Sequence, residues 1–244
     1  MKSIWIIYVI IIGYYLLGTA GIYFINIKKD RETRRKAWIK HITYFFLISI
    51  IFFSIAIKTE SFRYIAIVII VAGFFELIKL FLESGYRNML FFLVSLLALT
   101  VLSAGFYSFA LMEQGLVLFA FLILCIFDGF SQVTGQLLGK RRLFPKVSPN
   151  KTVEGLTGGA IVSILSALVF KNIIPADPVR SLITASVVVL FAFGGDALKS
   201  LYKRKYNVKD FSRLIPGHGG VLDRFDSLIA GGAGVALLGL FYSF

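Results

Sequence analysis

The stretch GLVLFAFLILCIFDGFSQVTGQLLGK, residues 115–140, begins as an apolar run and becomes polar at Asp128. Its first part, residues 115–134, has the roughly 20 largely apolar residues that a transmembrane helix needs. An ionised carboxylate inside a membrane span is costly unless it is paired or bound to a metal. The stretch therefore predicts a membrane helix whose Asp128 has a specific partner.

The whole chain has the composition of a membrane protein. Of its 244 residues, 58% are apolar and only 16% are charged, whereas soluble domains have about half and about a quarter. The predicted fold class is an all-α, polytopic integral membrane protein with about eight transmembrane helices; seven or nine spans remain alternatives. The expected spans are residues 4–27, 42–57, 64–82, 89–111, 115–134, 156–174, 181–198 and 225–244.

Basic residues predict the orientation, because they are retained on the cytoplasmic side of a membrane. Residues 28–41 carry seven Lys or Arg, residues 139–155 carry five and residues 199–224 carry seven. These connections are expected in the cytoplasm and both termini on the opposite side. A net charge of +13 then gives a basic face that attracts anionic headgroups or phosphate-bearing substrates, although the charges of residues 28–41 also suffice to set topology alone. A prokaryotic inner membrane fits best, although an endomembrane protein would have a similar sequence, and no nucleic-acid partner is expected.

Polar residues divide the chain into two predicted regions. Residues 1–112 read as a scaffold of membrane helices, and residues 113–244 as the catalytic region, because polar motifs concentrate there. The early exception is Glu76 with Lys79, which lie three residues apart on one helical face. This pair is either functional or a mutual neutralisation within packed helices.

The first two polar clusters lie at expected cytoplasmic helix ends. In the first, Asp128, Ser131 and two glycines recur at helical spacing, and the glycines alone favour packing. In the second, Ser148, Lys151 and Thr152 precede a helix. Hydroxyls, a lysine and free N–H groups at a helix start suit a phosphate, but a solvated helix start looks the same, and no Walker A loop is present.

The third cluster combines acids with bases. Asp196 ends one span, whereas Asp223 and Asp226 open the last and are neighbours on one helical face. Three carboxylates at one boundary repel each other unless a cation lies among them, and oxygen ligands without a Cys or His cluster favour Mg²⁺. Basic side chains suited to phosphates lie between the acids: Lys203, Arg204, Lys209, Arg213 and Arg224.

One long segment also carries a family resemblance. SLYKRKYNVKDFSRLIPGHGGVLDRFD, residues 200–226, closely resembles the C-terminal signature of the phosphatidate cytidylyltransferases, or CDP-diacylglycerol synthases. Residues 128–140 and 148–155 resemble upstream motifs of the family, so the resemblance covers about residues 125–230. It implies transfer of CMP from CTP to phosphatidic acid at a bilayer, with Mg²⁺ as cofactor and, as in some members, a second cation such as K⁺. Members of the family are often homodimers, but the sequence leaves the oligomeric state open.

The residues and the resemblance together give the candidate site. The expected catalytic residues are Asp196, Asp223, Lys203, Arg204 and His218. The expected substrate-binding residues are Ser148, Lys151, Thr152, Ser200, Lys209 and Arg224. The expected metal ligands are Asp196, Asp223, Asp226 and Asp128. His218 has three open roles: proton transfer, orientation of a metal-binding carboxylate, or donation to a phosphate.

The chain also departs from the family pattern. Lys199 stands where an acidic residue commonly follows the Gly-Asp pair, and this exchange can alter the number or affinity of metals. Gln132 and the pair Gly135-Gln136 stand where an aromatic residue and a Gly-Arg pair are common.

Three alternatives remain. A CTP-dependent lipid-alcohol kinase shares the upstream style of motif but lacks the His-Gly-Gly and Asp-Arg-x-Asp segment. A cytidylyltransferase for another lipid phosphate, such as an archaeal ether lipid, would carry the same site. A transporter would place its ionisable groups near the bilayer midplane, whereas here they gather at one face.

Overall fold

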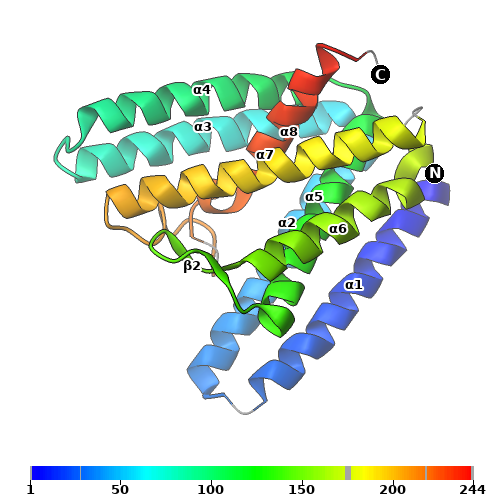
Figure 1. Cartoon of the computed structure of the whole chain (residues 1–244), viewed down its shortest axis with the longest axis horizontal. Helices are drawn as coiled ribbons and strands as arrows, with labels where there is room; N and C mark the ends of the chain where they lie inside the picture. Colours follow the sequence, from blue (N-terminus) through cyan, green and yellow to red (C-terminus); the bar gives the residue numbers. More distant parts are fainter. Residues whose placement is uncertain (1, 28, 174–176, 218, 243–244) are drawn as a thin grey trace.

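The computed structural model describes residues 2–27, 29–173, 177–217 and 219–242, most of which are helical (Figure 1). The helices are α1 (Lys2–Asn26), α2 (Arg31–Ile57), α3 (Thr59–Glu83), α4 (Met89–Ala110), α5 (Gln114–Leu138), α6 (Val153–Phe170), the 3₁₀ turn η1 (Lys171–Ile173), α7 (Pro178–Lys205) and α8 (Val221–Gly239); the strands are β1 (Arg142–Phe144) and β2 (Ser148–Thr152). Each predicted span overlaps a different α-helix. The prediction of an all-α, polytopic membrane protein is confirmed.

Length and composition single out six described helices, α2 to α7, as able to cross a membrane. The helices α1 and α8 are not among these six in the part of the chain that the structure describes. The expected number of eight spans therefore stays a prediction, as does the side of the membrane on which the polar ends lie.

Two helices extend further than hydropathy indicates. The helix α2 begins at Arg31, inside the basic segment, because Asp30 caps it by accepting a hydrogen bond from the Thr33 N–H at 2.8 Å. The helix α7 continues to Lys205 and carries three basic residues in its last turn, where positive charge stabilises the helix dipole. A helix can continue beyond the lipid, because its backbone hydrogen bonds also form in water. The length of an apolar run therefore underestimates the length of the helix that contains it.

A short antiparallel hairpin precedes α6. In it Arg142 pairs with Thr152 and Phe144 with Ser148. The sequence predicts a polar turn here, and the strands were missed because so short a polar run has no period-two pattern. The predicted helix start is confirmed, since the Thr152 hydroxyl caps α6 by accepting from the Gly155 N–H at 3.0 Å.

The helix α5 forms the centre of the bundle and buries every residue from Leu116 to Leu124. It packs most closely on α6, whereas α8 packs on α4 and α7. A Cβ added at Gly159 of α6 would lie 2.0 Å from the Ser131 hydroxyl and 3.0 Å from the Phe127 carbonyl of α5. Gly159 thus permits the close approach of α5 and α6.

Gly159→Ala is expected to lower the free energy of unfolding by about 1–3 kcal/mol, because the added methyl overpacks the α5–α6 contact. Gly129→Ala is the matched control, since a Cβ at that helical glycine would meet nothing within 4 Å. Thermal unfolding in detergent measures both variants. Equal midpoints for the two would contradict the packing role of Gly159.

Candidate functional site

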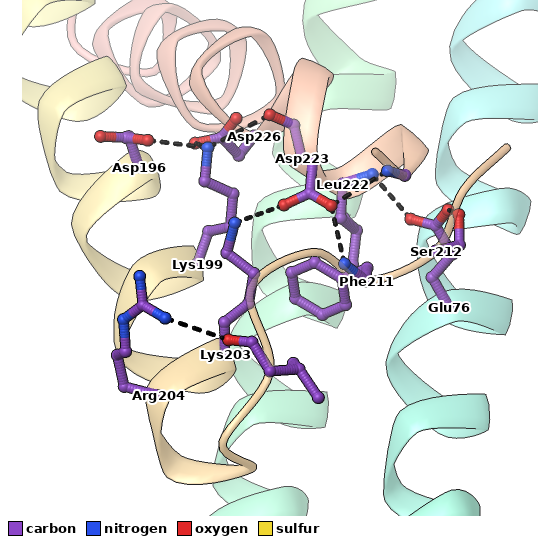
Figure 2. A network of polar contacts seen from close by, with 12 residues as sticks. Glu76, Asp196, Lys199, Lys203, Arg204, Phe211, Ser212, Leu222, Asp223 and Asp226 are labelled. Carbon is purple, nitrogen blue, oxygen red and sulfur yellow. Dashed lines mark hydrogen bonds and ion pairs between the residues drawn. The ribbon is translucent and has the colours of Figure 1, made fainter. Parts of the chain in front are cut away.

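The candidate site lies where α7 ends, α8 begins and residues 206–220 connect them (Figure 2). Within this connection, Ile215 and Gly219 exchange two backbone hydrogen bonds of 2.8 and 3.1 Å. The connection reverses the chain, so that the end of α7 faces the first turn of α8. The third predicted cluster is therefore brought together.

Asp223 is bonded at both of its carboxylate oxygens. Its Oδ1 lies 2.5 Å from the Lys203 ammonium, and its Oδ2 accepts from the backbone N–H groups of Phe211 at 2.7 Å and Gly220 at 3.0 Å. The Asp223 side chain is only 3% exposed. This carboxylate thus holds together the end of α7, the connecting segment and the start of α8, where a negative charge is favourable.

Lys199 lies between the other two acids of this cluster. Its ammonium is 2.7 Å from Asp196 Oδ1 and 3.0 Å from Asp226 Oδ2, and it donates to the Asp223 backbone carbonyl at 3.2 Å. Figure 2 shows its side chain reaching from α7 toward α8 between these oxygens. Lys199 therefore bridges Asp196 and Asp226, two of the four predicted metal ligands.

The upstream cluster reaches the same place through β2. The Lys151 ammonium forms an ion pair with Asp196 Oδ2, on the oxygen that Lys199 does not contact. Burial, together with the neighbouring charge of Lys199, lowers the pKa of Lys151 from its usual 10.5 to about 8. The expected meeting of the second and third clusters is thus observed at Asp196.

Arg204 ties the hairpin to the connecting segment. Its Nε donates to the Val147 carbonyl at 2.9 Å, and a terminal nitrogen donates to the Val208 carbonyl at 3.2 Å. Its side chain is otherwise exposed. Arg204 therefore holds the hairpin and the connecting segment together. Its remaining guanidinium N–H donors are exposed.

Asp128 lies deeper, in a small cavity of about 40 Å³ between α2, α5 and α8. Arg224 lines the same cavity, and its guanidinium lies 4.1 Å over the Tyr44 ring. The structure therefore places Arg224 of α8 at the same cavity as Asp128, and the specific partner predicted for Asp128 stays a prediction.

The remaining predicted residues occupy several positions. Ser148 begins β2 and is half-buried, and the Thr152 hydroxyl caps α6. Ser200 is buried in α7, whereas Lys209 is exposed in the connecting segment. His218 lies outside the described residues. The roles assigned to all of them stay predictions.

Glu76 of α3 is a site residue whose partners the sequence does not predict. The expected pairing with Lys79 is wrong, because Lys79 lies 3.7 Å from Glu83 on the exposed face of the helix. The Glu76 side chain is instead buried, 3% exposed. Residues three positions apart lie on one helical face, but their side chains need not contact each other.

The Glu76 carboxylate binds the start of α8. It accepts from the Ser212 hydroxyl at 2.7 Å and from the N–H groups of Val221 and Leu222, both at 2.8 Å (Figure 2). A Cβ at Gly220 would lie 2.5 Å from a Glu76 oxygen, so a larger residue there would have to displace this carboxylate. The available signal was a carboxylate in an apolar helix, which needs donors, and the free N–H groups of a helix start.

The carboxylates as arranged do not fit a Mg²⁺ ion. In the described residues, no three His, Cys, Asp or Glu side chains converge to hold a metal. Both Asp223 oxygens are bonded elsewhere, and Asp196 and Asp226 face the ammonium of Lys199. A divalent ion would compete with that ammonium for the same oxygens.

Comparison with known protein families and curated proteins finds related sequences. The sequence model described as the cytidylyltransferase family matches residues 1–242. Curated relatives named phosphatidate cytidylyltransferase come from Staphylococcus epidermidis, 42% identical over 139 residues (55% of this chain, 54% of the relative), and from Bacillus subtilis, 38% identical over 115 residues (46% and 43%). The chain thus spans about half the length of the curated relatives it matches. Because the family match covers nearly all of its residues, the chain belongs to the cytidylyltransferase family.

Proposed function

We propose that this chain transfers CMP from CTP to phosphatidic acid, giving CDP-diacylglycerol and pyrophosphate. The observation that carries the proposal is the convergence of Lys151, Lys199 and Lys203 with three aspartates where α7, α8 and β2 meet. Family membership and the printed name of the relatives, phosphatidate cytidylyltransferase, support the same reaction.

The proposed reaction needs charge neutralisation more than proton transfer. The attacking group is a phosphate monoester oxygen, which is already anionic near neutral pH because its second pKa is about 6. It attacks the α-phosphorus of CTP, and the bond from that phosphorus to the bridging oxygen of the β-phosphate breaks. The leaving pyrophosphate carries that electron pair. Positioned cations are the groups that stabilise such charge.

The chain's own cations would divide this work by position. Arg204 and Lys209, which are exposed on the solvent side, would receive the nucleotide phosphates. Arg224, beside the cavity between α2, α5 and α8, would receive the lipid phosphate. The predicted bacterial cell membrane, cytoplasmic site and homodimer remain part of this proposal. Mg²⁺ and a K⁺ companion also remain part of it, as ions that would accompany the phosphates of CTP, because Asp196 and Asp226 as arranged face the Lys199 ammonium.

Labelled CTP tests the proposed reaction. Purified full-length protein in phosphatidic acid vesicles with Mg²⁺ is given CTP labelled at either the α or the γ phosphorus. Label is expected in the extracted lipid only from the α position, because CMP is the transferred group. Label only from the γ position would replace the proposal with a lipid kinase, and no label from either position would remove both.

A parallel reaction with the phosphate of an archaeal ether lipid tests the acceptor. The proposal expects faster transfer to phosphatidic acid. Faster transfer to the ether lipid would retain cytidylyl transfer and reassign the lipid.

A further inference from the structure

The surroundings of the Lys199 ammonium match its bonding capacity. An ammonium has three N–H donors, and three oxygens lie around it, those of Asp196, Asp226 and the Asp223 backbone carbonyl, at 2.7, 3.0 and 3.2 Å. The Lys199 side chain is only 13% exposed. Lys199 is therefore enclosed by oxygens of the chain itself, unlike an exposed phosphate-binding lysine.

Charge around this ammonium is balanced by the chain itself. Asp196 contacts two ammonium groups, Lys199 and Lys151, one on each oxygen. Asp226, 8% exposed, contacts Lys199. Buried carboxylates are costly without compensating charge, and here two lysines compensate two aspartates without an added ion.

Lys199 also lies where it links two helices. It comes from α7 together with Asp196, three residues earlier, while Asp226 and the Asp223 carbonyl belong to α8. A cation that joins carboxylates from two elements is the usual structural work of a bound metal ion. In this chain the cation is covalently attached.

We propose that the Lys199 ammonium is a built-in cation that takes the place of a metal ion between Asp196 and Asp226 and competes with divalent ions for these carboxylates. The role of the Lys199 ammonium in catalysis rests on the proposed function, in which the cations of the site neutralise phosphate charge. Its test measures ion binding without nucleotide or lipid, so failure of the inference is distinguishable from failure of the proposed activity.

Mn²⁺ binding tests the inference. The loss of free Mn²⁺ signal in electron paramagnetic resonance is measured for the native protein, Lys199→Met and Lys79→Met, the last changing an exposed lysine of α3. Lys199→Met is expected to bind Mn²⁺ at least about tenfold more tightly than the native protein, because removal of a positive charge at contact distance uncovers two carboxylates. Lys79→Met is expected to match the native protein.

A purely structural ion pair gives a different result. Lys199→Met would then lose stability without gaining Mn²⁺ affinity, and this outcome, like tight Mn²⁺ binding by the native protein, would overturn the inference.

Amine labelling of the native protein decides the question even if Lys199→Met does not fold. A lysine-modifying reagent is applied with and without millimolar Mg²⁺, and modified peptides are quantified by mass spectrometry. Lys199 is expected to stay unmodified in both conditions, while Lys79, 48% exposed, reacts. Modification of Lys199 at this Mg²⁺ concentration would show that the metal ion, and not the ammonium, occupies the space between Asp196 and Asp226, and would refute the inference that the ammonium takes the place of the metal.

Discussion

Asp223→Asn is expected to abolish CMP transfer and to lower the free energy of unfolding by about 3–5 kcal/mol, the range for breaking one partner of a buried ion pair. The sequence alone predicts loss of turnover in a protein that stays folded. The contacts add the loss of stability, because the carboxylate accepts from Lys203, Phe211 and Gly220 with 3% exposure. An asparagine amide provides one acceptor oxygen and turns two donor hydrogens toward groups that are themselves donors.

Asp177→Asn is the matched control for this variant. Asp177 is also a carboxylate at a helix start, since it caps α7 by accepting from the Arg180 N–H at 2.9 Å, but it is exposed. Asparagine caps helices as well as aspartate does, so a near-native unfolding midpoint in detergent and near-native transfer are expected. Transfer by Asp223→Asn at a rate close to that of Asp177→Asn would exclude an essential role for the Asp223 charge.

Glu76→Ala is expected to lower the free energy of unfolding by about 3 kcal/mol or more, since each buried donor left without an acceptor costs about 1–3 kcal/mol. The three donors are the Ser212 hydroxyl and the N–H groups of Val221 and Leu222. Transfer is also expected to fall, because the first turn of α8 carries Asp223. Glu76 acts here as a positioning residue.

Thermal unfolding and amide hydrogen exchange measure this effect. The amides of Val221 and Leu222 are expected to exchange faster in Glu76→Ala, and Glu76→Gln, which keeps one acceptor oxygen, is expected to be intermediate. Glu83→Ala is the control on the same helix, where an exposed pair with Lys79 contributes little. Unchanged exchange at Val221 and Leu222 would be incompatible with the capping role of Glu76.

Local signals accounted for much of the fold. Hydropathy located each α-helix of the described residues, six of which are long and apolar enough to cross a membrane, because a lipid-facing helix must be apolar along its length. The start of α6 followed from Thr152, whose hydroxyl satisfies a free N–H of the first turn. The helix ends were less accurate, as α2 and α7 show, because polar residues outside the lipid continue a helix as readily as apolar ones.

The sequence indicated which residues gather in the candidate site, but not which contacts they make there. Asp196, Asp223 and Asp226 were expected around a metal ion, yet Lys199 lies between the first and last of them. The proposed division at residue 112 remains a prediction, but α3 contributes Glu76 to the start of α8. The packing of the helices decides which donor lies beside a buried carboxylate.

The sequence by itself determined that this chain is a helical membrane protein with its charged motifs at helix ends, because hydropathy and helical spacing are properties of consecutive residues. Only the tertiary structure decided which charge meets which. Glu76 and Leu222 are 146 residues apart, and Asp196 has two lysines in contact. Such pairings depend on how α3, α7, α8 and β2 approach one another. Once they form, breaking one of them would leave a buried charge without a partner, which is costly.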